Sequence, residues 1–525
     1  SIQTIQFLYH RKAKQLPVAI KNNKFQPMKT ILKSVFFLFL SLFIFQSCED
    51  NDDKPATNLT IQNFVWKGMN QYYLWQSDVP NLADDKFKNQ SELNAFLQGY
   101  STPESLFEAL RVDKSIDRFS WIVDDYVALE QSFQGTTKND GVDFGLSYKP
   151  GSTTEIFGYV RYIIPGSDAS TKAIKRGDYF TGVNGTQLTV SNYQTLLLNA
   201  ESYTLNLADY NGTTIVSNGK SVALTKTTLN ENPILINKVI ETGGKKIGYL
   251  MYNGFFANYD TQLNEAFGSL KSQGITDLIL DLRYNGGGSV QTATRLASMI
   301  TGQFTGKVFA KQQWNEKIEA YFSTNNPEAL KNFFTDKIGS TSINSLNLTK
   351  VYIITTKSTA SASELVINGL KPFITVVQIG DVTTGKNVGS ITLYDSPTFQ
   401  KENVNPSHKY AMQPLVLKIV NADGFGDYQS GLTPTFQQAE TISTFGVLGD
   451  FTTIIKDNEE ILVSYEPLLR KAIEKITGKE LKTSAKGIPS TKGKIFEYFK
   501  DSKSIKGFRN DMYLETIPEG LLKSL

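Results

Sequence analysis

The chain of 525 residues is poor in two reactive residue types, because it has one cysteine and two histidines. A single cysteine excludes an intramolecular disulfide, and nothing in the sequence clusters histidine or cysteine as a metal site requires. No phosphate-binding loop is found either, so no metal and no cofactor are expected. The formal net charge is only +3, because 54 basic residues nearly balance 51 acidic ones.

That small positive charge comes from the N-terminus. Residues 1–47 contain seven basic residues and no acid, so the rest of the chain has a net charge of −4, three minus seven. A mildly acidic body gives no support for binding nucleic acid. At 40% hydrophobic and 20% charged residues the chain is expected to fold, and its length is too great for one hydrophobic core.

The N-terminal region has the pattern of an export signal. A basic start at Met28 is followed by an apolar stretch, Val35–Phe45, which is too short to span a bilayer but suits a signal peptide. Cys48 follows directly, which resembles a bacterial lipoprotein signal; a plain secretory signal with a chance cysteine is the alternative. We expect residues 1–47 to be a leader and lipoprotein signal, Cys48 to be lipidated, and residues 48–57 to be an acidic tether. The protein would then be exported and anchored to a membrane of the bacterial cell envelope, periplasmic or surface-exposed.

Patterning divides the body into four parts and predicts an α/β multidomain protein. Residues 58–130 have helical periodicity, and residues 135–228 are rich in strand and turn signals. In residues 229–445 strands alternate with helices, which predicts a largely parallel sheet, with one antiparallel strand near its end. Residues 446–525 are predicted to form a helical tail, on the pattern NEEILVSYEPLLRKAIEKITG.

The second part resembles a PDZ domain. Residues 158–189 give a strand, a Pro-Gly-Ser turn, a short helix, a Gly-Asp turn and a hairpin with Asn184-Gly185 at its tip. The resemblance implies that Phe144, Gly145 and Leu146 form the loop that binds a peptide's C-terminal carboxylate while the peptide adds a strand to the sheet. A generic β-hairpin domain is the alternative.

Two serines stand where a helix begins after an apolar strand. Ser361 and Ser363 alternate with alanines, and they lie, like the glycine turn RYNGGG, at the carboxyl end of a predicted strand, where functional groups gather. A nucleophilic serine needs a base and an oxyanion hole. His10 lies in the expected leader and His408 in a polar, surface-like loop, so a histidine base is not expected, although His408 keeps it formally open.

A lysine can replace histidine if burial leaves it neutral near pH 7. Lys386 lies 25 residues beyond Ser361, after an apolar strand and among small residues. A helix and a strand could bring the chain back beside the serine over that separation. Because an isolated loop lysine is usually solvated, these residues alone leave the base open.

Three motifs resemble those of the C-terminal processing (tail-specific) serine peptidases. They are DLRYNGGG (281–288), TASASE (359–364) and TGKNVG (384–389), in this order and after a PDZ-like domain. The likeness also includes GLTP (431–434) and covers roughly residues 60–440. It implies a ClpP/crotonase-like α/β peptidase core with a mixed sheet.

The resemblance assigns roles to particular residues. It implies that Ser361 is the nucleophile, Lys386 the base, and Ser363 a structural serine that faces the helix. It also implies an oxyanion hole built from the backbone N–H groups of Gly287 and Ala362. Both positions suit that role, because glycine allows close approach and amides at a helix N-terminus lack intrahelical partners.

The sequence departs from the family where many members have a glutamine that orients the lysine. That position is Ser390 here, so Ser390 or Gln413 would have to orient Lys386. The resemblance implies a serine endopeptidase that cleaves proteins or peptides near unstructured C-termini through an acyl-enzyme, with the PDZ domain capturing the substrate tail. The alternatives are a catalytically impaired peptide-binding lipoprotein and a hydrolase of the same fold with a non-protein substrate.

Overall fold

A computed structural model describes residues 57–483, 496–506 and 511–515. The expected leader, the lipidation site Cys48 and the tether up to residue 56 lie outside the described residues. Within the described ranges, no helix combines the length and the apolar character needed to cross a membrane.

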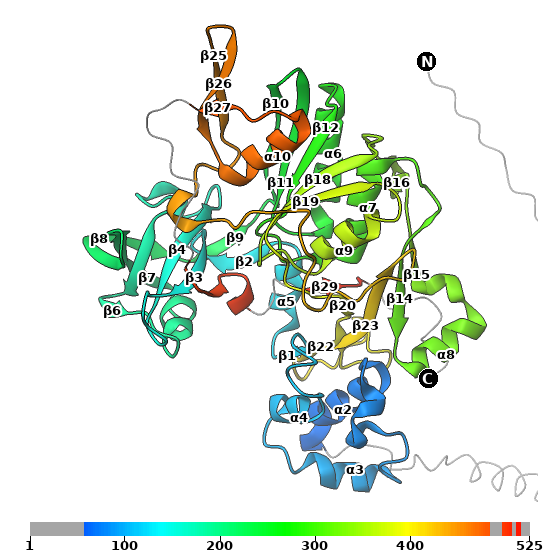
Figure 1. Ribbon diagram of the computed structural model, residues 1–525. Helices are drawn as coiled ribbons and strands as arrows, with labels where there is room; N and C mark the ends of the chain where they lie inside the picture. The colour runs from blue at the N-terminus through cyan, green and yellow to red at the C-terminus, as the bar shows by residue number, and fades with distance from the viewer. Residues whose placement is uncertain (1–56, 484–495, 507–510, 516–525) are drawn as a thin grey trace, which may run out of the picture. The chain divides into compact units, whose positions relative to one another are not determined.

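Residues 229–445, which we call the peptidase-like region, are built on a six-stranded sheet in the order β10-β11-β12-β18-β19-β24 (Figure 1). All neighbours are parallel except β10 and β11, and the apolar runs of β12 and β18 are buried, as is usual for parallel strands covered on both faces. The predicted alternation of strands and helices is therefore confirmed. The strands are β10 (Ile234–Thr242), β11 (Lys245–Tyr252), β12 (Asp277–Asp281), β18 (Lys350–Thr355), β19 (Thr375–Gly380) and β24 (Phe436–Gln437), and the helices between them are α6 (Asp260–Ser272), α7 (Val290–Thr301) and α9 (Ala362–Leu370).

A second six-stranded sheet has the order β13-β29-β20-β23-β14-β15. As predicted, its strand from residues 415–421 is antiparallel to its neighbours. The strands are β13 (Gly288–Ser289), β14 (Val308–Trp314), β15 (Lys331–Phe333), β20 (Val388–Ser390), β23 (Leu415–Asn421) and β29 (Met512–Tyr513). The last of these comes from the end of the chain.

The predicted helical region precedes the sheets and packs into the same hydrophobic core. Thr102 caps the helix that begins at Pro103, because its hydroxyl accepts from Ser105 N while Ser105 Oγ accepts from Thr102 N. The chain then enters the peptidase-like region as a short strand paired with β22. These elements are α2 (Thr60–Tyr72), α3 (Gln90–Leu97), α4 (Pro103–Ala109), β1 (Trp121–Val123), α5 (Tyr126–Phe133) and β22 (Ala411–Gln413).

Residues 142–225 form a sheet with its own core, in the order β3-β4-β5-β7-β8. The hairpin tip is at the predicted place, because Asn184 and Gly185 both have positive φ. Phe144, Gly145 and Leu146, however, lie inside a strand and pair with Val160, Tyr159 and Gly158, so they do not form the expected carboxylate-binding loop. The strands are β3 (Val142–Tyr148), β4 (Ile156–Ile163), β5 (Tyr179–Val183), β7 (Ser202–Tyr210) and β8 (Ile215–Thr225).

For the described residues beyond 446, the prediction of a helical tail is wrong apart from one α-helix, and the rest of that range lies outside the described residues. Residues 451–465 form a hairpin, because EEILVSY has strand-forming residues and Asp457 and Asn458 adopt positive φ at the turn. Helix α10 starts only at Pro467, where Glu466 accepts from the first free amides. The elements are β25 (Phe451–Lys456), β26 (Glu459–Tyr465), α10 (Pro467–Thr477) and β28 (Tyr498–Asp501), together with β29.

The remaining β-strands and α-helix of the described residues are β2 (Thr136–Asn139), β6 (Thr186–Gln187), β9 (Thr227–Asn230), α8 (Glu316–Asn325), β16 (Lys337–Ile338), β17 (Thr341–Ser342), β21 (Leu393–Tyr394) and β27 (Lys482–Thr483).

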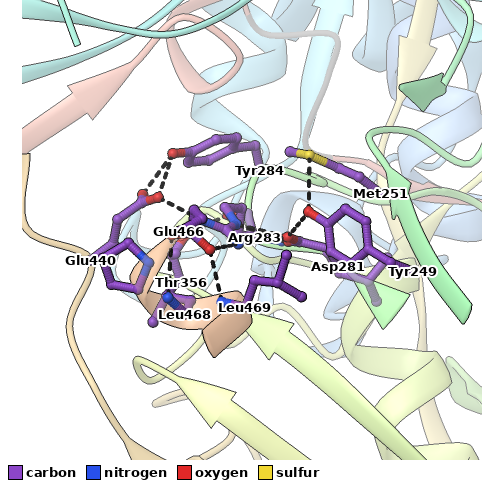
Figure 2. A network of polar contacts seen from close by, with 12 residues as sticks. Tyr249, Met251, Asp281, Arg283, Tyr284, Thr356, Glu440, Glu466, Leu468 and Leu469 are labelled. Carbon is purple, nitrogen blue, oxygen red and sulfur yellow. Dashed lines mark hydrogen bonds and ion pairs between the residues drawn. The ribbon is translucent and has the colours of Figure 1, made fainter. Parts of the chain in front are cut away.

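The arginine of the DLR motif lies at the centre of a buried polar network (Figure 2). Its guanidinium contacts Asp281 at 2.7 Å, Glu466 at 2.8 Å and Glu440 at 3.0 Å. Tyr249 Oη donates to Asp281 at 2.7 Å, and Glu466 also caps α10. Arg283 therefore joins the end of β12 to the chain before and at the start of α10, which gives this motif a structural role.

Replacing Arg283 by methionine tests that role. The substitution leaves three carboxylates without their shared cation, and we expect a loss of about 3–5 kcal/mol in the free energy of unfolding. Lys482→Met is the matched control, because it removes the cation from the exposed Lys482–Glu459 pair and should cost about 1 kcal/mol or less. Urea unfolding followed by tryptophan fluorescence measures both. Equal midpoints for the two variants would contradict the structural role of Arg283.

Candidate active site

Ser361 stands at the turn from β18 into α9 in a strained conformation. Its φ of 65° and ψ of −118° place it in a region that residues other than glycine rarely occupy. The residue is fully buried, and no group among the described residues hydrogen-bonds its Oγ. Its neighbour Ser363 instead donates its Oγ proton to Asn285 O at 3.0 Å, across to the glycine turn. Only the first serine thus has an uncommitted hydroxyl.

The carboxylate of Glu364 joins this serine to the lysine loop. Its Oε2 accepts from Ser361 N at 2.7 Å and from Lys386 N at 2.8 Å, so the two backbone nitrogens lie within about 5.5 Å, the sum of the two bonds. Its Oε1 accepts from Gly385 N at 2.7 Å and from the hydroxyl of Thr383. Burial raises the pKa of Glu364, and these hydrogen bonds offset only part of that rise.

The side chain of Lys386 is fully buried, so it is not a solvated loop lysine. Its Nζ forms an ion pair with Asp511 Oδ1 at 2.9 Å. The same nitrogen lies 4.6 Å from the ring centroid of Phe119, on the face that attracts cations. The backbone of this turn is held as well, since Arg118 donates to Gly385 O at 2.6 Å.

The glycine turn lies directly against the nucleophile candidate. Gly287 has a φ of 110°, and a Cβ there would lie 2.6 Å from Ser361 Cβ and 2.9 Å from Ala362 N. Ala362 is the first residue of α9, where amides lack intrahelical acceptors. The N–H of Gly287 donates to Asn285 Oδ1 at 2.9 Å, so in this structure the expected oxyanion donor has an internal acceptor.

The two residues expected to orient the lysine have other partners. Ser390 Oγ donates to Met512 O at 3.4 Å, and Gln413 donates to the hydroxyl of Thr392. Their role toward Lys386 stays a prediction.

His408 is engaged elsewhere. Its Nε2 lies 2.9 Å from Asp395 Oδ2 and its Nδ1 accepts from Tyr410 N. His408 lies in a loop as predicted, but its side chain is only 9% exposed and both of its ring nitrogens have partners. In the described part of the chain, no group of three or more histidine, cysteine or acidic residues could hold a metal ion.

Three residues beside the lysine have no recognisable signal in the sequence. Arg118 and Phe119 belong to the stretch DRFSW, whose pattern indicates only the end of the helical segment. Asp511 lies near the end of the sequence, where no hydrophobic periodicity is evident. Their arrival at the site depends on long-range packing, which local periodicity does not encode.

Two segments of the chain match known domains. Residues 60–121 match the Peptidase S41 N-terminal domain, and residues 246–396, which contain Gly287, Ser361 and Lys386, match Peptidase family S41. Both domain models describe parts of S41 peptidases, and the two matches together cover less than half of the chain. This agrees with the resemblance drawn from the three motifs.

Known proteins align with more of the chain than these two domains. A "Carboxyl-terminal-processing protease" of Picosynechococcus sp. is 23% identical over 51% of this chain and 64% of its own length. "Carboxyl-terminal-processing peptidase 2, chloroplastic" of Arabidopsis thaliana is 24% identical over 64% of this chain and 63% of its own. The chain thus spans a little under two thirds of these curated relatives. A crystal structure from Bacteroides fragilis, provisionally described as an S41 protease, superimposes with a TM-score of 0.59 and 26% identity, over 79% of this chain and 97% of the other.

Replacing Gly287 by alanine tests the close approach to Ser361. The added methyl group meets backbone and Cβ atoms that cannot move independently, so we expect a loss of about 1–3 kcal/mol from overpacking on top of backbone strain. Gly185→Ala is the control, since Gly185 also has positive φ but has open space around it, and only the strain of about 1–2 kcal/mol applies. Differential scanning calorimetry should show a lower Tm for Gly287→Ala than for Gly185→Ala. Equal values would mean that the turn does not pack tightly on Ser361.

Proposed function

We propose that this chain is a serine endopeptidase that uses a Ser361–Lys386 dyad to cleave proteins or peptides near unstructured C-termini. The observation that carries the proposal is the shared Glu364 oxygen, which holds the backbone of both residues together while Ser361 Oγ has no hydrogen-bond partner in the described structure. A buried hydroxyl without a partner is costly, and a strained backbone persists only where the surroundings impose it. Both features suit a poised nucleophile.

In the proposed mechanism Lys386 acts in its neutral form. Its Nζ takes the proton of Ser361 Oγ as the oxygen attacks the scissile carbonyl, and the N–H groups of Ala362 and the glycine turn stabilise the oxyanion. The ring of Phe119 faces the ammonium that forms. The lysine then protonates the leaving amine, and water activated by the same nitrogen hydrolyses the acyl-enzyme. Ser390 or Gln413 orients Lys386 in this proposal.

Residues 135–228 are proposed to act as a PDZ domain that captures the substrate tail. The order of strands, turns and hairpin supports this, and an added strand is accommodated at the outer edge of β3, where β28 pairs in this structure. We further propose export and lipid anchoring through Cys48, so that the enzyme acts on protein or peptide C-termini at the cell envelope.

Alanine variants of the dyad test the activity. Incubating the protein with a disordered peptide that has an apolar C-terminus should give cleavage, which Ser361→Ala and Lys386→Ala should each reduce by at least about a thousandfold, since the two act as a unit. Products are followed by mass spectrometry over a long incubation, so that slow turnover is detected. His408→Gln is the control and should cleave like the wild type. Substantial turnover by Lys386→Ala with loss in His408→Gln would point to histidine as the base, and binding without any cleavage would leave a peptide-binding protein.

A further inference from the structure

Two described stretches near the end of the sequence lie in both places where a peptide is proposed to bind. We call residues 496–506 and 511–515 the C-terminal segment. In Figure 1 its red parts lie beside the cyan strand β3 and beside β20. The segment comes from the part of the sequence with the weakest pattern, yet its described residues are held by paired strands and buried charges.

The first part adds a strand to the edge of β3. Strand β28 pairs antiparallel with β3, with Asp501 opposite Gly145 and Lys500 opposite Leu146. Ser502 N donates to Phe144 O at 2.8 Å, and Phe144 N donates to Ser502 Oγ at 3.2 Å. An added antiparallel strand is one of the recurring modes of peptide recognition. The backbone groups of the expected PDZ peptide site are therefore occupied by the chain itself.

A buried carboxylate connects this strand to the catalytic loop. Asp501 accepts from Arg161 on β4 at 3.1 Å and from Ser358 Oγ at 2.6 Å, three residues before Ser361. Although burial alone would raise it, Arg161, Ser358 and Tyr498 hold the pKa of Asp501 at about 2. This carboxylate is charged at neutral pH, and it accepts hydrogen bonds from the sheet of residues 142–225 through Arg161 and from the loop before α9 through Ser358.

A buried lysine fixes the next residues. Lys503 is only 4% exposed, and its Nζ donates to Asn253 O at 2.8 Å and to Tyr284 O at 2.7 Å. Tyr284 belongs to the DLRYNGGG motif, so the segment here touches the chain that leads into the glycine turn.

The second part fills the space between the glycine turn and the lysine loop. Strand β29 pairs parallel with β13 through Met512 and Gly288, and with β20 through Tyr513 and Ser390. Leu514 N donates to Ser390 O at 3.0 Å. The ring of Tyr513 stacks on Phe133 of α5 with centroids 4.1 Å apart. These contacts hold an extended peptide across the site.

Asp511 covers the proposed dyad. Its main-chain oxygen lies 2.9 Å from the position that a Cβ of Gly287 would take, and Ser361 Cβ lies 2.6 Å from the same point. Its carboxylate forms the 2.9 Å ion pair with Lys386. An ion pair requires the ammonium form of Lys386, whereas a general base must be neutral.

We propose that the C-terminal segment is an autoinhibitory ligand of its own chain. It occupies the edge of β3 and the position between β13 and β20, which together we call the track, and its Asp511 forms an ion pair with the proposed base. The ligand class that this track accepts is an extended peptide with a carboxylate at the catalytic centre. The inhibitory part rests on the proposed peptidase function, while occupation of the track does not.

Full-length variants test the inhibition. Asp511→Asn removes the carboxylate that pairs with Lys386, and Asp501→Asn removes the one that pairs with Arg161. Each should raise the rate of cleavage of a disordered fluorogenic peptide by about tenfold, because a segment that has lost one buried charge pair spends more time displaced. Asp277→Asn is the control, since it breaks the Lys245–Asp277 pair at the far end of β12 and should leave the rate unchanged. Wild-type cleavage with no gain in either tail variant would overturn the inhibition and leave the peptidase function standing.

Amide hydrogen exchange tests the occupied track without any catalysis. In full-length Ser361→Ala protein, residues 498–502 and 512–514 should be protected, and adding Asp501→Asn or Asp511→Asn should speed their exchange by about tenfold while adding Asp277→Asn should not. Unprotected exchange of these residues in Ser361→Ala would overturn the proposal, whatever the activity. Protection together with no cleavage by any variant would support the occupied track and reject the peptidase function.

Discussion

The candidate site depends on one buried carboxylate. Glu364 accepts hydrogen bonds from the backbone of Ser361, Gly385 and Lys386, so two loops that are far apart in the sequence become one rigid unit. The carboxylate lies in the first turn of α9, where free amides and the helix dipole favour negative charge. Because both loops are tied to the same group, neither can relax alone, and the strained φ of Ser361 can persist.

Charge pairing also decides how the C-terminal segment is held. Buried charges are tolerated only when they are paired or hydrogen-bonded, and Asp501, Lys503 and Asp511 all meet partners on other parts of the chain. Arg161 has a second carboxylate partner in Asp143, at 2.5 Å, so releasing Asp501 does not strand its charge. Lys386 likewise retains the face of Phe119. Displacing the segment is thus costly but does not leave the arginine without a carboxylate.

Local patterns in the sequence were sufficient for most of the peptidase-like region. Apolar runs predict the strands β12 and β18, because both strands are buried in the sheet. The order of motifs was needed to single out Ser361, since two serines on one helix start look alike.

The strands β28 and β29 could not be predicted. They are short, and what stabilises them is the unpaired edges of other sheets and buried partners such as Arg161, which only the folded chain brings near. Asp511 could not be predicted for the same reason, because its partner Lys386 is brought near only by the fold, and a single acidic residue in the sequence is typical of a surface position.

The two attachment points of the C-terminal segment are coupled because one chain connects them. The edge of β3 can pair with one added strand at a time, since β4 occupies its other side, and the groove between β13 and β20 is filled by β29. An external peptide that pairs with β3 must therefore first remove β28. While β28 is paired with β3, the chain that connects the two strands keeps β29 at a high effective concentration near β13 and β20. When β28 is displaced this effective concentration falls, so β29 dissociates from β13 and β20 more readily. Under the proposed function, a substrate tail that binds at β3 lowers the cost of removing β29 from beside Ser361, which links capture of a tail to uncovering of Ser361 without any change in the sheets themselves.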